Sequence, residues 1–279
     1  MSRALKGGIF KGLLLFSLFV GFLMLTVLLV DVFNDGLPYL DLDLLTNPPS
    51  SDPQIAGARP AIIATLYIGV LLLLFVVPLG VGTAIYLEEY ADKTRWYNKL
   101  LEINIQNLAA VPSIVYGILG LAFLVRGIGL GRVLLAGAMI LTLLVLPTVI
   151  IAAREAIRSV PDSIRQGAYA LGATQWQVVS RQVLPAAIPG IATGSILALS
   201  RAIGETAPLI MIGAVTYISF DPTILGPFTA LPIQIYSFLR LPQAEITLLA
   251  AASIIVLLAI LLTLNAFAIY IRNRYRRSW

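Results

Sequence analysis

The chain has 279 residues, of which 59% are hydrophobic and 12% are charged, so it carries too little polar surface for a soluble globule and most of it is expected to lie in lipid. It contains neither cysteine nor histidine, which leaves disulfides, thiolate metal sites and Ser-His-Asp, Cys-His or histidine-zinc catalysis without their parts. Its formal charge of +5 comes from basic residues in short runs beside apolar segments, a pattern that predicts membrane orientation and no nucleic-acid partner.

Six apolar stretches are each long enough for the roughly 20 residues with which a helix crosses a bilayer. The predicted spans are Ile9 to Val30, Pro60 to Leu87, Leu100 to Val125, Val133 to Ala153, Ala186 to Ile218 and Ile246 to Ile271. The first is too long and too apolar for a cleaved signal sequence, and we expect a retained signal anchor. The sequence therefore predicts an all-α membrane protein with six transmembrane helices.

These spans divide the chain into three predicted parts. Residues 1–59 hold the N-terminal cytoplasmic end, the first transmembrane helix and an acidic external loop. Residues 60–271 form one membrane domain with a long cytoplasmic loop at 154–185, and residues 272–279 form a basic cytoplasmic tail. No strong internal repeat of the kind found in inverted-repeat secondary transporters is evident in the sequence.

The distribution of lysine and arginine predicts which loops face the cytoplasm, because short cytoplasmic loops hold the excess of positive charge. One side of the membrane carries Arg3, Lys6, Lys11, Lys93, Arg95, Lys99, Arg154, Arg158, Arg165, Arg181, Arg272, Arg274, Arg276 and Arg277. The other side carries Arg59, Arg126, Arg132 and Arg240. Both termini are therefore predicted to be cytoplasmic, and the acidic segment 31–52 is predicted to lie outside. Arg201 fits neither side, because it falls inside the fifth span.

The third span begins with polar side chains and contains a proline. Asn104 and Asn107 lie near its start, and Pro112 and Ser113 follow one turn later. Polar amides at membrane depth usually face the interior of a helix bundle, where they either line a path or hydrogen-bond a neighbouring helix, and both alternatives stay open. Pro112 is expected to kink the helix.

The cytoplasmic loop at 154–185 is predicted to be helical. A break at residues 159–162 is followed by apolar residues at helical spacing, with Gly172 interrupting them. The recurring residues are Ile164, Ala168, Leu171, Trp176, Val179 and Val183. Two short helices that meet at Gly172 would present an apolar ridge to a cytoplasmic partner. Periodicity alone would favour an ordinary pair of amphipathic helices at the membrane surface over a docking ridge.

The fifth span places a charge pair at membrane depth. Arg201 lies about fifteen residues past the cytoplasmic start, roughly 20 Å into the bilayer. A charge there costs at least ~2.5 kcal/mol, and Glu205 at i, i+4 shares its helical face. The pair is either a structural ion pair or an anion gate in which the guanidinium fork binds oxyanion oxygens. Gly190, Gly194 and Ser195, earlier in the span, predict close packing against another helix.

The cytoplasmic loop resembles the EAA loop of ABC importer permeases. The order is Gln166-Gly167-Ala168, three residues, Gly172, nine residues, then Gln182-Val183-Leu184-Pro185. That family usually has Glu-Ala-Ala at the first three places and isoleucine at the place of Gln182. The chain keeps Ala168, Gly172, Leu184 and Pro185 and departs at Gln166, Gly167 and Gln182. The resemblance implies a coupling helix that docks into an ATP-hydrolysing subunit, without a salt bridge from residue 166.

The run Arg201-Ala202-Ile203-Gly204-Glu205-Thr206-Ala207-Pro208 resembles the signature of phosphate importer permeases, and residues 111–117 resemble them too. The resemblance covers residues 60–271 and implies the type I ABC importer permease fold, which is MetI-like. It implies a pathway for inorganic phosphate that includes Arg201, Glu205, Thr206, Asn104, Asn107 and Ser113. The implied coupling residues are Gln166, Gly167, Ala168, Gly172, Leu184 and Pro185. A permease for another tetrahedral oxyanion and a secondary anion transporter remain as alternatives.

The same resemblance implies the partners of this chain. They are a second, homologous permease subunit, two copies of an ATPase, and a periplasmic or lipid-anchored phosphate-binding protein. No Gly-x-x-x-x-Gly-Lys-Ser/Thr motif occurs, so ATP hydrolysis is assigned to the separate subunit and the chain itself is not predicted to be an enzyme. No cofactor and no metal ion is predicted. The chain is expected to be a multi-pass protein of the cell inner membrane, in contact with lipid.

Overall fold

The structure is a computed structural model that describes residues 3–275, and the regular elements in that range are helices. Their order and bounds are α1 Arg3–Gly36, η1 Leu37–Tyr39, α2 Leu42–Thr46, α3 Arg59–Ile85, η2 Tyr86–Tyr90, α4 Trp96–Ala109, α5 Ser113–Gly120, η3 Leu121–Gly127, α6 Leu134–Arg158, α7 Asp162–Ala170, α8 Gln175–Val178, η4 Val179–Val183, α9 Leu184–Ile203, α10 Ala207–Met211, α11 Leu231–Leu239 and α12 Ala244–Tyr275. The η2, η3 and η4 segments are π-helical. The end of the predicted basic tail, residues 276–279, lies outside the described residues.

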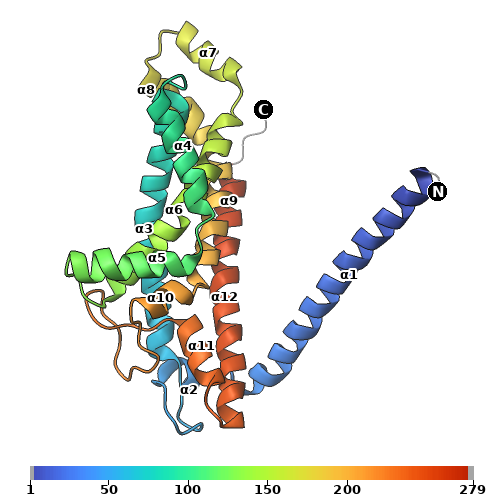
Figure 1. Cartoon of the computed structure of the whole chain (residues 1–279), viewed down its shortest axis with the longest axis vertical. Coiled ribbons are helices and arrows are strands. Elements are labelled where there is room, and N and C mark those ends of the chain that lie inside the picture. The colour runs from blue at the N-terminus through green and yellow to red at the C-terminus, as the bar shows by residue number, and fades with distance from the viewer. Residues whose placement is uncertain (1–2, 276–279) are drawn as a thin grey trace.

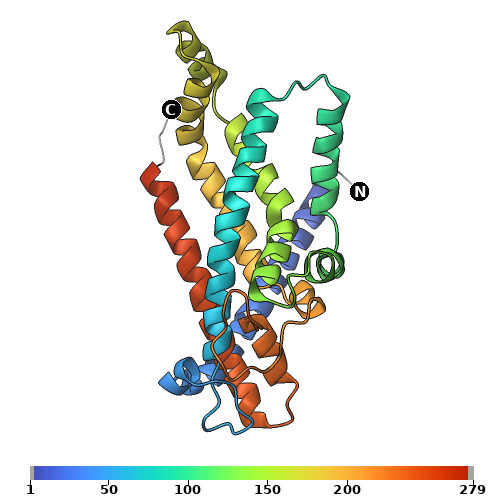
Figure 2. The same ribbon diagram turned by 90° about the vertical axis from the view of Figure 1, so that its left-hand side faces the viewer.

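Within the described range, five helical segments are long and apolar enough to cross a membrane, and there are six when the bent pair Trp96–Ala109 and Ser113–Gly127 is counted as one span. The five are Gly7–Tyr39, Arg59–Tyr90, Leu134–Arg158, Gln175–Ile203 and Ala244–Arg274. α3, α6, α9 and α12 stand side by side as a bundle (Figures 1 and 2). The start of α1 and the end of α12 point to the side of the bundle that carries α7 (Figure 1). This arrangement agrees with the predicted placement of both termini on one side of the membrane.

The predicted span from Leu100 to Val125 is a pair of helices that is sharply bent at the proline where a kink was expected. α4 ends at Ala109, and the segment Ser113–Gly127 leaves it at an angle of 105°. Pro112 caps the start of α5 with an extended ψ of 138°, and because it has no N–H it cannot continue the hydrogen bonds of α4. The Tyr116 hydroxyl donates to the Leu108 carbonyl at 2.9 Å and holds the corner. The kink expected at Pro112 is thus a full corner, and α5 runs across the bundle (Figure 1).

The fifth crossing ends earlier than its hydropathy predicts. α9 stops at Ile203 with Gly204 as its C-cap, whereas the sequence predicted a span that runs to Ile218. Pro208 then lies in the first turn of the short helix α10, where its missing N–H is tolerated but a continuous helix is not. Arg201 consequently sits in the last turn of α9, and Glu205 lies beyond the end of that helix.

α6 and α9 pack together through small residues, as the sequence predicted for this stretch. A Cβ placed on Gly194 would lie 2.3 Å from the Ala152 Cβ, and one on Gly190 would lie 2.7 Å from the Ala156 Cβ. Such distances leave no room for any side chain, so the two backbones approach as closely as helices can. This close approach places α9, with Arg201 at its far end, directly against α6, the most deeply buried of the membrane-spanning helices in the described residues.

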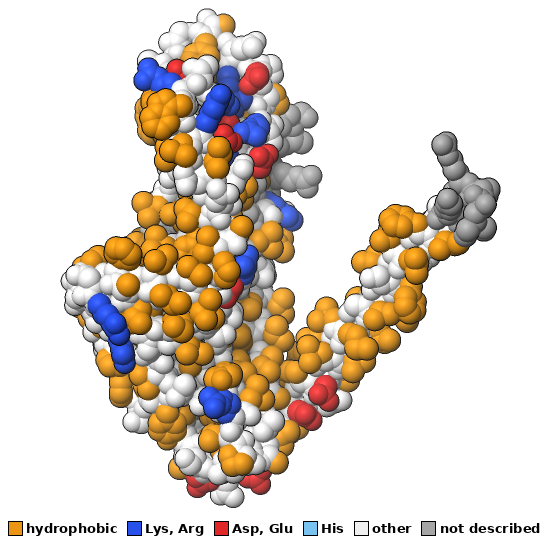
Figure 3. Space-filling view, viewed as in Figure 1, with side chains coloured by type: hydrophobic (Ala, Val, Ile, Leu, Met, Phe, Trp, Pro, Cys, Tyr) orange, Lys and Arg blue, Asp and Glu red, His pale blue; other side chains and the backbone are white. Residues whose placement is uncertain are grey.

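α1 stands apart from the bundle along most of its length. It meets α12 only near its C-terminal end, where a Cβ on Gly36 would lie 2.7 Å from the Ala251 backbone. The apolar side chains of α1 are exposed, and they follow the helix along most of its length in Figure 3. Lipid or another subunit must cover this surface in the membrane.

Candidate functional site

The cytoplasmic loop forms two short helices that meet at Gly172, as predicted. α7 and α8 project from one end of the bundle (Figure 1). Gly172 has φ +80°, and its N–H donates to the Tyr169 carbonyl at 2.9 Å while the Ala173 N–H donates to the Ala168 carbonyl at 3.1 Å. These two bonds are the Schellman arrangement that ends a helix in a left-handed residue. The backbone conformation therefore requires the glycine, since no other atom lies within 4 Å of the position of its missing Cβ.

The predicted apolar ridge of this loop is divided between two directions. Val179 and Val183 are buried against the end of the bundle, and Ala168 is half-buried. Leu171, by contrast, is 90% exposed, and Trp176 beside it is exposed as well. Exposed apolar side chains of this size are candidates for contact with another protein. The remaining candidate coupling residues include the exposed Gln166 and Gly167 and the half-buried Leu184 and Pro185.

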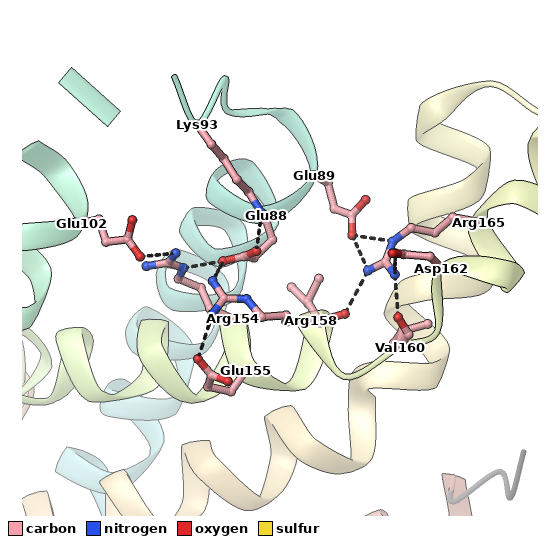
Figure 4. Close-up of polar contacts among 11 residues, drawn as sticks. Glu88, Glu89, Lys93, Glu102, Arg154, Glu155, Arg158, Val160, Asp162 and Arg165 are labelled. Atoms are coloured by element: carbon pink, nitrogen blue, oxygen red, sulfur yellow. Dashed lines mark hydrogen bonds and ion pairs between the residues drawn. The ribbon is translucent and has the colours of Figure 1, made fainter. Parts of the chain in front are cut away.

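Two adjacent glutamates form a charge cluster that the sequence did not reveal (Figure 4). Glu88 lies in the π-helical turn η2, its side chain is 4% exposed, and it accepts hydrogen bonds from Arg154 Nε and Arg158 Nη2, both at 2.8 Å. Arg154 Nη2 also donates to Glu102 of α4 at 2.7 Å. Glu89, 7% exposed, accepts from Arg165 Nη2 at 2.9 Å. The cluster thus joins α3, α4, α6 and α7.

Burial of these charges is possible because each of them has a partner of opposite sign. From the sequence, the arginines of this cluster were used only to predict membrane topology. Arg154 and Glu88 are 66 positions apart, so no local spacing indicates that they pair. One signal was present: two consecutive glutamates at the end of an apolar span, Glu88 and Glu89, where a single charge would already be costly.

The predicted ion pair between Arg201 and Glu205 is present, with Arg201 Nε 3.5 Å from Glu205 Oε1. The Arg201 side chain is 65% exposed in this chain and that of Glu205 is 20% exposed. The neighbouring Ser200 hydroxyl donates to Asn265 Oδ1 of α12 at 2.9 Å, which places this end of α9 beside the apolar part of α12. An arginine at that depth faces water or another protein surface rather than hydrocarbon.

The structure brings together two of the sequence motifs. A Cβ on Gly117 of α5 would lie 2.8 Å from the Pro208 Cα and the Met211 Cβ of α10. Segment 111–117 and segment 201–208 therefore pack against each other. Ser113 at the start of α5 and Thr206 just before α10 are both half-buried.

Asn104 and Asn107 lie on the exposed surface of α4, and no recorded contact of the described residues joins them to Arg201 or Glu205. The Asn104 amide donates to the Leu100 carbonyl of its own helix at 2.8 Å. In the isolated chain it therefore bonds neither a neighbouring helix nor the charge pair. Among residues 3–275, no group of three or more acidic side chains is placed to hold a metal ion.

Comparison with known proteins places this geometry in context. Residues 77–277 match the family described as binding-protein-dependent transport system inner membrane component. The chain is 38% identical over 172 residues to the probable ABC transporter permease protein YqgH of Bacillus subtilis (strain 168), which covers 60% of this chain and 55% of that relative. It is 35% identical over 217 residues to the phosphate transport system permease protein PstA 1 of Mycobacterium tuberculosis (strain ATCC 25618 / H37Rv), which covers 77% of this chain and 70% of that relative.

Two solved structures share the arrangement of helices. A chain of a bacterial ABC transporter involved in the import of the acidic polysaccharide alginate aligns with a TM-score of 0.64 at 19% identity, over 99% of this chain and 100% of that one. A chain of the MetNI methionine ABC transporter in an inward-facing conformation aligns with a TM-score of 0.63 at 17% identity, over 79% and 95% of the two chains. At these identities the likeness concerns the fold alone.

Proposed function

The chain belongs to the binding-protein-dependent transport system inner membrane component family, and from this premise we propose that it carries inorganic phosphate as a permease subunit of an ABC importer. Its fold is that of type I ABC importer permeases, and it is a multi-pass protein of the inner membrane. As the inner membrane component of such a system, it is the permease and not the ATPase, as the sequence predicted. Importers of this kind work with an ATPase and a binding protein.

The Arg201–Glu205 pair is the observation that carries the phosphate proposal. It lies within the run from Arg201 to Pro208, and its arginine is exposed at the depth of the transmembrane helices. A guanidinium fork matches the spacing of phosphate oxygens and presents several donors at once. The likeness to PstA 1, which is named as a phosphate transport permease, supports the same substrate.

The geometry of the pair suits a transient anion site. Glu205 contacts Arg201 through Nε at 3.5 Å, which leaves the two terminal nitrogens of the guanidinium available to an anion. The carboxylate keeps the arginine in position and repels a bare anion that would otherwise bind too tightly to leave. Phosphate would then be held briefly as it passes, with Thr206 and Ser113 near the same corner of α5 and α10. Asn104 and Asn107 would join the pathway only if α4 turns toward it.

We propose a different partner protein for each end of the helix bundle. We assign the exposed apolar residues of α7 and α8 to the docking site for an ATPase dimer, with Gly172 at the turn between them. A second, homologous permease subunit would cover the exposed side of Arg201 and complete the pathway. A periplasmic or lipid-anchored phosphate-binding protein would deliver the substrate from the opposite side.

The test of the substrate is uptake by the whole complex in proteoliposomes. We expect labelled phosphate to accumulate in an ATP-dependent manner and the phosphate-loaded receptor to stimulate ATP hydrolysis. Sulfate and molybdate, offered with the same receptor preparation, should compete poorly. Uptake of another tetrahedral oxyanion in preference to phosphate would reject the substrate proposal and leave the assignment as an importer permease in place.

A further inference from the structure

Glu89 is attached to both arms of the cytoplasmic loop. Its carboxylate accepts from Arg165 of α7 through Nη2 at 2.9 Å and Nε at 3.2 Å. Its backbone carbonyl accepts from the Gln175 side-chain amide, at the first residue of α8. Glu89, in the η2 turn that follows α3, is therefore hydrogen-bonded to both short helices that flank Gly172.

Arg165 also fixes α7 to the end of α6. Its Nη1 donates to the Val160 carbonyl at 2.6 Å, and its Nη2 donates to the Ile157 carbonyl at 2.9 Å. These carbonyls belong to the last turn of α6 and the residues just after it, where a helix leaves carbonyls without the usual i+4 donors. With its side chain 16% exposed and hydrogen bonds from all three nitrogens, Arg165 connects the loop to α3 and α6 in a defined geometry.

Glu88, the preceding residue, is attached to the other side of the junction. It binds Arg154 and Arg158 of α6, and Lys93 reaches it at 3.2 Å (Figure 4). Arg154 extends the connection to Glu102 of α4 at 2.7 Å. Consecutive residues in a helical turn point in different directions, so one side chain faces the loop and the other faces α6 and α4.

α4 has few other attachments to the bundle. Among its residues Trp96–Ala109, only Asn98 is buried. Its helix neighbour in the described part of the chain is α6, which carries Arg154. α4 leads through the corner at Pro112 into α5, and α5 packs on α10 next to Glu205. A displacement of Glu102 would therefore be carried along α4 to the segment that holds the Arg201–Glu205 pair.

We propose that Glu88 and Glu89 form a two-sided junction that transmits movement of the cytoplasmic loop to α4, with Arg165 and Arg154 as its positioning residues. The π-helical turn η2 is suited to this role, because such turns are locally wide and occur at functional sites. Buried ion pairs are weak evidence for stability, whereas removing one partner of such a pair leaves an uncompensated charge and disturbs the geometry around it. The proposal rests on the docking of the loop on an ATPase, as proposed above, and it is independent of the identity of the substrate.

Spin labels can test the junction, because the chain contains no cysteine of its own. Cysteines at the exposed positions Gln106 of α4, Ser163 of α7 and Thr263 of α12 give two distances, from α4 to α12 and from α7 to α12. They are measured by pulsed EPR in the complete complex, with and without trapped nucleotide. In the otherwise unchanged chain, both distances should shift when nucleotide is trapped.

Glu102→Gln is the decisive variant, because it weakens only the connection to α4 and leaves the pairs of Glu88 with α6 in place. We expect the α7 distance to shift as before, the α4 shift to disappear, and the ATP consumed per phosphate transported to rise roughly three- to tenfold. Glu89→Gln should reduce both shifts. Glu155→Gln is the matched control, since Glu155 pairs with Arg158 at 3.4 Å but contacts neither α3 nor α4, and it should behave like the parent.

The results for Glu102→Gln and for the parent complex test the junction separately from the proposed transport of phosphate. An unchanged α4 shift and an unchanged ratio of ATP to phosphate in Glu102→Gln would overturn the junction. A lost α4 shift in Glu102→Gln that returns in Glu102→Asp, which keeps the charge, would support a charge-specific link over a merely structural one. Failure of the parent complex to move phosphate would instead reject the substrate, and failure of nucleotide to shift the α7 distance would reject the docking of the loop.

Discussion

Arg201 combines a place inside a transmembrane helix with an exposed side chain. Arg154 and Arg165 of the Glu88–Glu89 cluster are 9% and 16% exposed, whereas Arg201 has a single carboxylate partner at 3.5 Å and a side chain that is 65% exposed. A residue whose only role is to pin two helices would be expected to bury its charge between them. The exposed geometry is therefore the feature that separates a transport role from a packing role.

Arg201→Gln removes the charge but keeps much of the length and some hydrogen-bonding capacity. We expect the complex to assemble and to hydrolyse ATP in response to the loaded receptor, while phosphate flux falls by about 10-fold or more, because one charge-assisted donor to phosphate is worth roughly 1.5–3 kcal/mol. Flux and ATP hydrolysis are measured together in proteoliposomes. Near-normal flux would remove Arg201 from the pathway, and loss of expression would assign the pair to packing.

Glu205→Gln is the companion change and tests the other half of the pair. It removes the counter-charge while leaving Arg201 free to hold an anion, so phosphate should bind more tightly and leave more slowly. We expect a lower half-saturating phosphate concentration together with a lower maximal flux. A rise in flux, or no change in either quantity, would contradict the holding role of Glu205.

Gly172 calls for a comparison of two substitutions, because its φ of +80° strains most other residues. Asparagine and aspartate tolerate this region better than other side chains and have nearly the same size. We expect Gly172→Asn to retain the ATPase during purification and Gly172→Asp to lose it, since a new charge would have to be desolvated in the contact. Equal retention of the ATPase by the two variants would show that residue 172 lies outside the contact.

At the scale of single elements, hydropathy predicted where helices cross the membrane but not where they end. Residues on both sides of the corner at Pro112 are mostly apolar, and the polar residues around Gly204 are too few to lower an averaged hydropathy, so such a pattern passes over both places. The proline was predicted to kink its helix, yet the 105° angle depends on how α5 packs on α10, which is a contact between distant segments. The local sequence therefore indicated the corner at Pro112 only as a kink, and it gave no prediction of the break at Gly204.

The candidate site was predictable to the extent that its members are close in sequence. Arg201 and Glu205 follow from helical spacing, and Gly172 follows from its place between two periodic segments. The cluster of Glu88 and Glu89 could not be predicted in this way. Their partners Arg154 and Arg165 belong to helices that meet η2 only in the folded bundle. Burial of a charge is decided by tertiary contacts, and a single sequence does not contain them.

The contact of α6 with α9 permits a test of helix packing with a built-in rescue. Gly194→Ala would place a Cβ 2.3 Å from the Ala152 Cβ, and we expect overpacking to destabilise the chain by about 1–3 kcal/mol. Ala152→Gly in the same chain should recover most of that loss. Gly82→Ala is the control, because no atom lies within 4 Å of the corresponding position. The measurement is the thermal unfolding midpoint in detergent, and a Gly194→Ala variant as stable as the control would contradict the tight packing.

At the scale of the whole molecule, the two ends of the bundle differ in what they expose. The end with α7 and α8 carries the charge cluster together with exposed Leu171 and Trp176, whereas the opposite end carries acidic residues around α2 (Figures 1 and 3). Between them lie the corner of α4 and α5 and the unwound segment after α9. In the proposed junction, a movement of α7 and α8 therefore passes through η2 and α4 to α5 and α10, beside Arg201 and Glu205.

Leu171 tests whether the first end is the site of attachment to the ATPase. Its side chain is 90% exposed and extends from the turn between the two short helices, which is the geometry of an anchor that fills a pocket on a partner. We expect Leu171→Asp to weaken binding of the ATPase by at least about 2 kcal/mol, the loss typical of a central anchor residue, and to abolish uptake in parallel. Binding is measured as retention of the ATPase during affinity purification of this chain.

Leu225→Asp provides the matched control, because Leu225 is 70% exposed in the loop before α11, near the opposite end of the bundle. An aspartate there adds the same charge to the chain without touching α7 or α8, so the ATPase should be retained. Equal loss of the ATPase in both variants would point to general destabilisation by the new charge. Retention in both would place the attachment elsewhere on the cytoplasmic surface and would remove the first step of the route from the loop to α4.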